Sequence, residues 1–327
     1  MIRQTKYLVL NLALLISLYP TIAITDQEIE RDLLINELIQ EHGFDEQYVM
    51  NIFDNTKFLP ELIESISKPA ERTKTWPEYR DIFITNKRIA AGVLFAKQNN
   101  DIINRVVAEM GVPRKILLGI LGVETYFGRI QGSYKVMDSL YTLATGYPPR
   151  ASFFKSELIN LFYLCREEDF SILDIKGSYA GAMGAAQFIS SSYRNYAVDG
   201  NADGKVDLFD SWDDALMSIG NYLKQNGWDT SKQIYSRYPA NEVQVSKLSS
   251  KTIKPTSTIQ DLLNHGIEID DFNKDDIAQL IQLDEQDLGS DSFIGHHNFY
   301  VITTYNRNVM YALAVIQLGE SIERYLN

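Results

Sequence analysis

The most informative stretch of the chain is the apolar run Ile116-Leu117-Leu118-Gly119-Ile120-Leu121-Gly122-Val123-Glu124-Thr125-Tyr126-Phe127-Gly128. At the 3.6-residue period of an α-helix, one face of this run holds four side chains, Ile120, Leu121, Glu124 and Phe127. A carboxyl group on that face lies where hydrocarbon is normally found, which costs free energy unless the group has a task. The run therefore predicts a buried helix that carries a functional glutamate.

The surroundings of Glu124 predict a proton donor. Burial disfavours the charged form of a carboxyl group, so we expect it to raise the pKa of Glu124. The last helical turn before Gly128 acts in the same direction, because the negative end of the helix dipole lies there. A glutamate that stays protonated near neutral pH is a general acid. The alternative is a residue at the protein rim whose carboxylate reaches solvent.

The N-terminus indicates export from the cytoplasm. Arg3 and Lys6 precede the apolar run 7–19, and a small-residue site follows, ending at Ala23. The run is shorter than the roughly 20 residues that cross a bilayer, so residues 1–23 are interpreted as a cleavable signal peptide and the mature chain as periplasmic. An uncleaved membrane anchor is the alternative. No cysteine follows the run, so no lipid anchor is expected.

Charge excludes one class of function. The formal net charge of −12 comes without a basic stripe, so the chain is not expected to bind nucleic acid. The single cysteine, Cys165, lies among apolar residues and is interpreted as core filler. About 300 mature residues exceed the size at which one hydrophobic core stops growing, so two or three lobes are expected.

Helical spacing dominates the first two thirds of the chain. It predicts helices within 26–66 and a long helix over 86–110, with a loop at 76–80 between them. The dipeptide Val112-Pro113 opens the glutamate helix. Residues 242–248 and 299–304 alternate β-branched and polar residues, as strands do, which predicts a β-containing insertion late in the chain. A last helix, 307–326, is expected to pack back on the N-terminal helices.

A second motif predicts a calcium ion. Residues 199–210 match the D-x-N-x-D-G loop, in which side-chain oxygens stand at positions one, three and five and a backbone carbonyl at seven. The predicted ligands are Asp199, Asn201, Asp203 and the carbonyl of Lys205. Position twelve carries an aspartate in place of the usual glutamate, so the last ligand is Asp210, Asp213 or Asp214. The ion would be structural; the alternative is an acidic turn without metal.

Small residues dominate between these two motifs, over residues 177–188. Such residues allow a close approach, either between packed elements or to a ligand. The stretch ends in Gln187 and Phe188, and an amide beside an aromatic ring suits a sugar-binding floor.

Taken in order, these motifs resemble lytic murein transglycosylase B and its family. They are Gly122-Val123-Glu124-Thr125, Phe127-Gly128-Arg129, Tyr147-Pro148-Pro149-Arg150-Ala151, Gly177-Ser178-Tyr179-Ala180-Gly181-Ala182-Met183-Gly184, Gln187-Phe188 and the calcium loop. The resemblance covers essentially the mature chain. It implies a mainly α (α+β) fold, in which a lysozyme-like helical core carries an EF-hand-like calcium loop.

The resemblance also implies a division into segments. Residues 24–112 would form a helical N-terminal domain, 113–230 the lysozyme-like core, 231–303 the small β insertion, and 304–327 a C-terminal helix that packs on the helical domain. The implied partner is the glycan strand of peptidoglycan, with other cell-wall enzymes as further candidates. A monomer is expected, with Ca²⁺ as the structural ion and no organic cofactor.

The implied reaction is cleavage of the β-1,4 bond between MurNAc and GlcNAc with formation of a 1,6-anhydro-MurNAc end. Glu124 would protonate the glycosidic oxygen, the substrate's N-acetyl group would stabilise the positive centre, and Glu124 would then take the proton of the O6 hydroxyl. Asp138 is the tempting second carboxylate that most glycosidases employ, but it is interpreted as a helix N-cap. The alternatives are a lysozyme-type hydrolase and a peptidoglycan-binding scaffold without turnover.

Positions that match the family's saccharide groove are spread along the chain. They are Tyr79, Arg150, Ser178, Gln187, Phe188, Tyr222, Tyr305, Asn306 and Tyr311. The chain departs from the pattern at Pro149, where the family has a first arginine before Arg150. In the calcium loop, Asp214 would be the last ligand, with one extra residue before it.

Overall fold

The computed structural model describes residues 19–68, 73–248, 253–269, 273–283 and 292–326. This part of the chain is mainly helical, as the sequence predicts, and contains one two-stranded and one four-stranded sheet. The four-stranded sheet lies in the predicted late β region, whereas the two-stranded sheet was not predicted. None of the described helices combines the length and the apolar character needed to cross a membrane. Most of the predicted signal peptide, residues 1–18, lies outside the described residues.

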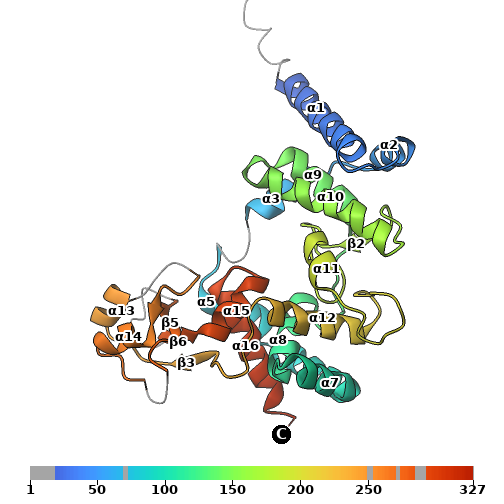
Figure 1. Ribbon diagram of the computed structural model, residues 1–327. Coiled ribbons are helices and arrows are strands. Elements are labelled where there is room, and N and C mark those ends of the chain that lie inside the picture. The colour runs from blue at the N-terminus through green and yellow to red at the C-terminus, as the bar shows by residue number, and fades with distance from the viewer. Residues whose placement is uncertain (1–18, 69–72, 249–252, 270–272, 284–291, 327) are drawn as a thin grey trace, which may run out of the picture.

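One layer of the molecule joins two separate parts of the sequence (Figure 1). Helices α9 (Val136–Gly146) and α10 (Ala151–Glu167) pack on each other, joined by the short 3-10 turn η1 (Pro148–Arg150). The first helices pack against α9; they are α1 (Tyr19–Gln40), α2 (Glu46–Asp54) and α3 (Glu61–Ser67). Backbone donors fix this contact, because Lys57 N–H donates to Asp138 Oδ1 at 2.8 Å.

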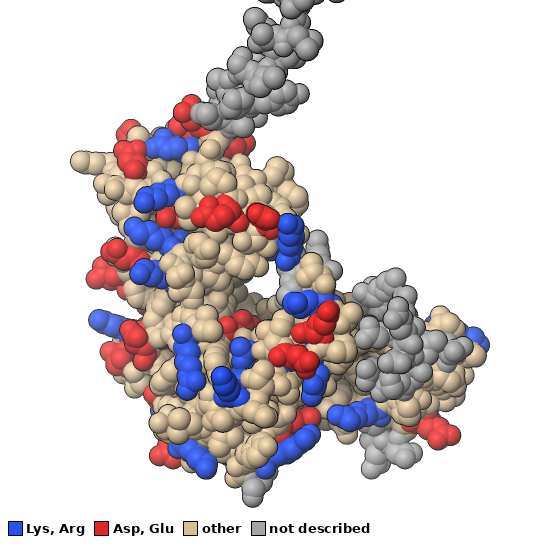
Figure 2. Space-filling view, turned by 180° about the vertical axis from the view of Figure 1, so that it is seen from behind, with Lys and Arg blue, Asp and Glu red and all other residues tan. Residues whose placement is uncertain are grey.

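A second helical layer lies below the first in Figure 1. It consists of α5 (Trp76–Phe83), α6 (Asn86–Gln98), α7 (Asn100–Met110), α8 (Arg114–Thr125), α12 (Trp212–Gln225), α15 (His297–Tyr305) and α16 (Val309–Glu323). Between the layers run β1 (Tyr134–Lys135), β2 (Lys176–Gly177) and α11 (Ser190–Tyr196). Figure 2 shows the surface hollowed between the two layers, with basic and acidic side chains interspersed around the hollow.

Helices α8 and α16 cross closely because each contributes a glycine to the contact. A Cβ atom at Gly119 would collide with the carbonyl of Val315, and one at Gly319 would collide with the carbonyl of Lys115. The pairing of 119 with 315 and of 115 with 319 makes the helices antiparallel. Consequently the end of α8 faces the beginning of α16.

The β insertion forms a body with its own small core. Its antiparallel sheet has the order β3 (Tyr235–Arg237), β6 (Ser292–His296), β5 (Ile277–Gln282), β4 (Ser257–Thr258). Helices α13 (Glu242–Leu248) and α14 (Ile259–Asn264) pack on β5. The buried side chains of this core are Ala240, Ile259, Leu262, Ile267, Ala278, Leu280 and Ile294.

Two segments predicted as strands are helices. Residues 242–248 form α13, because Asn241 and Gln244 cap it by exchanging hydrogen bonds between their side chains and backbone N–H groups. Residues 299–304 lie within α15, where Val301 and Ile302 are fully buried. Their β-branched side chains indicated a strand, but burial in the core outweighs the small helix penalty of such residues.

Two further expectations near α5 and α6 were wrong. Residues 76–80 were predicted as a loop and instead begin α5, where Thr75 and Glu78 form a capping box and Pro77 stands in the first turn. The long helix expected over 86–110 is broken at Asn99, whose side chain donates to the carbonyl of Phe95 at 3.0 Å. The break lets α6 and α7 run in different directions.

Candidate active site

The glutamate helix ends in an unusual turn. Helix α8 stops at Thr125, and Tyr126 and Phe127 both adopt left-handed backbone conformations, with φ of 52° and 60°. Each such residue costs about 1–2 kcal/mol, so the turn must be held by its contacts. Phe127 supplies one of them: its ring stacks on Phe95 at a centroid distance of 5.5 Å. Phe127 therefore lies beyond the helix and not on its face, contrary to the sequence prediction.

Glu124 occupies the last turn of α8 and has a close donor. The Tyr311 hydroxyl donates to Glu124 Oε1 at 2.6 Å, from the first turn of α16. Glu124 is partly exposed, whereas Val123 and Thr125 on either side are buried. The sequence left open whether Glu124 is buried or lies at the protein rim. The structure gives an intermediate case, because its neighbours are buried while Glu124 itself is partly exposed.

Aromatic rings continue from this pair. The Tyr305 ring stacks near Tyr311 at 6.4 Å with an interplanar angle of 11°, and Tyr222 and Phe188 pack on Tyr305 at 4.8 Å and 5.8 Å. Burial, together with the charge of Glu124, raises the pKa of Tyr305 and Tyr311 well above the usual tyrosine value. Both hydroxyl groups therefore stay protonated and remain hydrogen-bond donors near neutral pH.

The small-residue segment 177–188 lies directly against the end of α8. Thr125, fully buried, donates from Oγ1 to the carbonyl of Ala185 at 3.0 Å. Ser178 Oγ accepts from the N–H groups of Ala180 and Ala182, which closes the turn. Gln187 has a left-handed φ of 50° and its amide donates to the carbonyl of Gln131 at 3.1 Å. Close approach within the protein therefore explains the small residues.

The remaining groove candidates divide into two sets. Tyr79 is 2% exposed and its proximity contributes to the raised pKa of Tyr311, so it belongs to the Glu124 cluster. Asn306 directly follows Tyr305 at the end of α15. Arg150 lies in the other layer, where its guanidinium stacks on Phe153 at 4.3 Å.

Two other buried carboxyl groups, those of Asp138 and Glu157, accept hydrogen bonds from backbone N–H groups. Asp138 lies inside the first turn of α9 and is not its N-cap, a position held by Lys135, so that interpretation was wrong. Its Oδ1 atom accepts from Lys57 N–H. Glu157 accepts from Ser191 N–H at 2.8 Å at the start of α11. These carboxylates are structural.

The predicted calcium loop is closed by its own oxygens. Asp199 accepts from the N–H groups of Asp203 and Gly204, and the hydrogen bond from Gly204 is the main reason why the pKa of Asp199 is lowered. Asn201 Nδ2 donates to Asp203 Oδ2 at 3.0 Å, so these side chains converge. Asp214, 1% exposed, accepts from Gly200 and Asp207 N–H and ties the loop ends together.

The oxygen donors of this loop suit a hard cation such as Ca²⁺. Within the described part of the chain, however, no group of three His, Cys, Asp or Glu side chains is arranged as a metal site. The ligand set predicted from sequence mixes the carboxylates of Asp199 and Asp203 with the amide oxygen of Asn201 and the carbonyl of Lys205.

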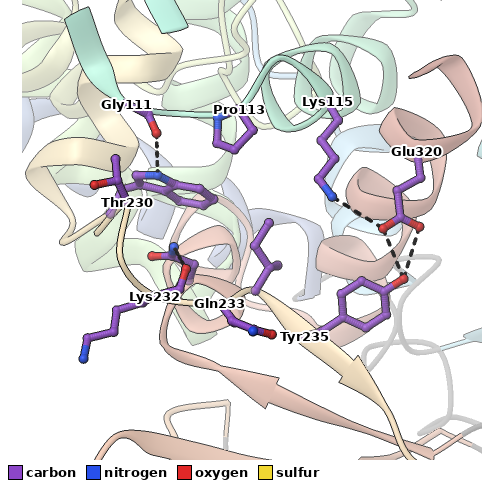
Figure 3. A pocket seen from close by; sticks show the side chains of 11 residues that line it. Gly111, Pro113, Lys115, Thr230, Lys232, Gln233, Tyr235 and Glu320 are labelled. Carbon is purple, nitrogen blue, oxygen red and sulfur yellow. Dashed lines mark hydrogen bonds and ion pairs between the residues drawn. The ribbon is translucent and has the colours of Figure 1, made fainter. Parts of the chain in front are cut away.

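A cavity of 360 Å³ lies at the opposite end of α8 from Glu124 (Figure 3). Lys115 and Tyr235 both approach the carboxylate of Glu320, Tyr235 at 3.1 Å and Lys115 at 3.7 Å. The Trp228 indole donates to the carbonyl of Gly111 at 3.0 Å. These contacts join the β insertion to α8 and α16, so the cavity marks a joint of the fold and is separate from the Glu124 cluster.

The fold and this cluster define a class of protein. Residues 27–320 match the family model described as Transglycosylase SLT domain. The chain belongs to this transglycosylase family, as its sequence motifs predicted.

Individual relatives agree with the family. Membrane-bound lytic murein transglycosylase B of Escherichia coli K12 is 36% identical over 307 residues, which are 88% of this chain and 81% of the relative. The crystal structure of the soluble lytic transglycosylase SltB1 of Pseudomonas aeruginosa has a TM-score of 0.84 at 39% identity and covers 92% of this chain and 99% of its own. The Escherichia coli lytic transglycosylase Slt35, solved in complex with calcium, has a TM-score of 0.80 at 34% identity, covering 90% and 93%.

The function follows from these matches. The protein is a peptidoglycan lytic transglycosylase, an enzyme that cleaves the glycosidic bonds of murein without hydrolysis.

Proposed function

We propose that Glu124 alone supplies the acid and the base of this reaction. The observation that carries the proposal is its position: a carboxyl group at the end of a buried helix, held at 2.6 Å by a tyrosine hydroxyl and surrounded by aromatic rings. As an acid, Glu124 protonates the glycosidic oxygen between MurNAc and GlcNAc. The N-acetyl group of MurNAc stabilises the positive centre, and Glu124 then accepts the O6 proton as the 1,6-anhydro ring closes.

Side chains around Glu124 are proposed to hold the glycan. Tyr79, Phe188, Tyr222, Tyr305 and Tyr311 supply rings against which sugar faces pack, and Ser178, Gln187 and Asn306 supply polar groups for hydroxyl and amide contacts. Arg150 faces the glycan from the other layer in this proposal. In support, SltB3 of Pseudomonas aeruginosa, 27% identical with a TM-score of 0.75 and covering 91% of this chain and 79% of its own, was solved in complex with NAG-NAM-pentapeptide.

The test uses purified peptidoglycan, the mature protein and the variant Glu124→Gln. Anhydro-muropeptides, detected by mass spectrometry, are expected from the wild type and not from the variant, which should still sediment with the sacculus. Reducing-end products would indicate a lysozyme-type hydrolase and overturn the mechanism. Sedimentation of the wild type without any product would instead support a binding scaffold.

The loop 199–210 is proposed to bind a structural Ca²⁺. The ligands would be Asp199, Asn201, Asp203 and the carbonyl of Lys205, with Asp214 as the closing carboxylate. The calcium complex of Slt35 supports this assignment. Bound there, the ion would fix the loop against the start of α12, where Ser211 caps the helix through Asp214 N–H.

The location proposed for the mature enzyme is the periplasm, reached through the signal peptide 1–23, as a monomer that works on glycan strands beside other cell-wall enzymes. N-terminal sequencing of the protein from the periplasmic fraction tests cleavage after Ala23. An intact N-terminus in the membrane fraction would favour the uncleaved anchor.

A further inference from the structure

A series of ring and cation–π contacts connects the Glu124 cluster to Arg88 and Arg129, two arginines that have no role in the reaction above. The Tyr79 ring contacts Phe83 at 5.1 Å. The guanidinium carbon of Arg88 lies 5.1 Å from the Phe83 centroid and 4.8 Å from that of Tyr126, and the guanidinium carbon of Arg129 lies 5.0 Å from the Tyr126 centroid. Tyr126 therefore carries two cations, and it stands two residues after the catalytic glutamate.

These two cations lack counter-charges. Across the residues that the structure describes, neither guanidinium makes an ion pair, and Nη1 of Arg88 is buried without a hydrogen-bond partner. Burial lowers the pKa of Arg88, and the one charge that acts against this is the Tyr126 hydroxyl, not a carboxylate. A desolvated guanidinium without an anion is costly, and binding an anion offsets that cost.

The geometry points to an anion subsite. We infer that Arg88 and Arg129 bind a carboxylate of the peptide stem attached to MurNAc, an inference that rests on Glu124 being the catalytic acid. Two residues span at most about 7 Å, so the backbone of Tyr126 is close to Glu124, and Tyr79 of the Glu124 cluster contacts Phe83, on which Arg88 lies. The two arginines are therefore within reach of a stem that extends from the sugar at Glu124. A guanidinium matches a carboxylate with two parallel hydrogen bonds, and stacking on a ring fixes its plane in advance.

The net charge of the enzyme makes such a subsite useful. A chain of formal net charge −12 repels an anionic stem at long range. Two adjacent cations attract the stem at short range, where they outweigh the repulsion by the net charge. At physiological ionic strength, charges farther apart than the Debye length of about 8 Å are largely screened. The subsite would therefore select glycan strands that still carry stems over strands that have lost them.

The experiment compares two substrates: peptidoglycan strands with stem peptides, and strands from which an amidase has removed the stems, which leaves only the lactyl carboxylate on each MurNAc. Anhydro-end formation is measured for the wild type, for Arg88→Gln, for Arg129→Gln and for the double variant. Each single variant loses charge-assisted hydrogen bonds to the stem, so it should raise KM roughly tenfold or more on stem-bearing strands. The effect should fall below twofold on stripped strands, with kcat little changed on both.

The matched control is Arg166→Gln. Arg166 also stacks on two rings, Phe44 at 4.5 Å and Tyr163 at 4.9 Å, but it lies on α10 in the other layer. It should leave KM on both substrates at the wild-type value. Arg88→Lys keeps the charge but loses the two-pronged hydrogen bonding, so it should fall between wild type and Arg88→Gln.

The outcomes separate this inference from the proposed function. If the wild type forms anhydro ends and the arginine variants lose equally on both substrates, or on neither, the subsite is wrong and the acid stands. If the wild type forms no anhydro ends, the proposed function has failed. Thermal unfolding of each variant shows whether a loss reflects misfolding, and a stable variant with unchanged KM on stem-bearing strands overturns the inference.

Discussion

A hydrogen bond between residues 187 positions apart holds the proposed catalytic group. Tyr311 is 1% exposed and cannot exchange its donor for water, so its hydroxyl holds one carboxyl oxygen of Glu124 in place. This carboxyl group is the one that we propose protonates the substrate. If Glu124 is the acid, as proposed, Tyr311 is its positioning residue.

Replacing Tyr311 by phenylalanine tests this positioning. The ring and its stack on Tyr305 are kept, while the donor to Glu124 is lost, so we expect kcat to fall at least about tenfold, the equivalent of 1.5 kcal/mol for a charge-assisted hydrogen bond. Anhydro-muropeptide formation gives kcat, and calorimetry should show a small change in Tm. A wild-type kcat in Tyr311→Phe would show that the hydrogen bond does not position the acid.

Asp138 offers a direct test of a second catalytic carboxylate. Its Oδ1 atom accepts from Lys57 N–H, an interaction that an asparagine can retain. Asp138→Asn should therefore keep activity within about twofold, whereas Asp138→Ala should lower the free energy of unfolding by about 1–3 kcal/mol through an unsatisfied buried N–H. Activity assays and urea unfolding measure both. Loss of turnover in a stable Asp138→Asn protein would revive the two-carboxylate mechanism.

At this scale the sequence singled out Glu124 as the candidate acid, because a charge within an apolar helix is conspicuous. Arg88 could not be singled out in the same way, because it interrupts no sequence pattern. Its cation–π contacts with Phe83 and Tyr126 are visible only in the structure. The two left-handed residues after α8 were also missed, because neither Tyr126 nor Phe127 is a residue that usually marks such a turn.

The crossing of α8 and α16 is the element that brings acid and tyrosine together. Gly319→Ala would place a methyl group against the carbonyl of Lys115, and overpacking of this kind costs about 1–3 kcal/mol. We expect a lower Tm and reduced activity, because a shift of α16 also moves Tyr311. Leu94→Ala on α6, at a side chain 51% exposed, is the control and should stay within about 0.5 kcal/mol. An unchanged Tm in Gly319→Ala would contradict the tight crossing.

The junction between β6 and α15 predicts a pH dependence. His296 is 3% exposed, and burial lowers its pKa from 6.5 to about 4. The unfolded chain therefore binds a proton below pH 6.5 that the folded protein does not, so stability falls as the pH falls from 6.5 to about 4. At about 1.4 kcal/mol per pKa unit, the loss is roughly 3 kcal/mol.

Urea unfolding between pH 4 and pH 7 measures this loss. His296→Asn should be less stable at pH 7, because the bond between Nε2 and Ser236 Oγ at 2.9 Å is altered, but its slope between pH 6.5 and pH 4 should be smaller than that of the wild type. Equal slopes would show that His296 does not titrate differently in the folded and unfolded states.

Element types were predictable where periodicity and capping agreed. The glutamate helix and the late β region met that condition, whereas α13 and α15 did not. Residues 299–304 carry the composition of a strand, and only their enclosure between the helical layer and the sheet selects a helix. Such a decision depends on tertiary burial, which local sequence does not contain.

At the scale of the whole molecule, the proposed calcium loop connects two helices, and a bound ion would stabilise that connection. It lies between α11 and α12, and Asp199 contributes two acceptor oxygens to its backbone. If calcium binds there, a free ion concentration 100 times the dissociation constant stabilises the fold by about 2.7 kcal/mol. Chelation should lower Tm, calcium should restore it, and Asp199→Asn should respond far less. The same Tm with and without calcium would exclude the ion.

The arrangement of the two layers was only partly foreseeable. The sequence predicted a helical protein with a late β region. It did not predict that residues 19–67 pack on α9 and α10, because periodicity does not tell which helix covers which face. Arg150 shows the consequence: the family motif marked it as a groove residue, and its place is in the layer opposite Glu124.

The antiparallel contact of α8 with α16 also joins residues from distant parts of the chain. A chain made from its N-terminus presents Glu124 long before Tyr311 exists, and closing a loop of this length is slow. A nascent or C-terminally clipped chain therefore lacks the Tyr311 hydroxyl that donates to Glu124. If Glu124 is the catalytic acid, as proposed, the site is complete only once α16 has folded onto α8, so a partly made chain is expected to be inactive on murein.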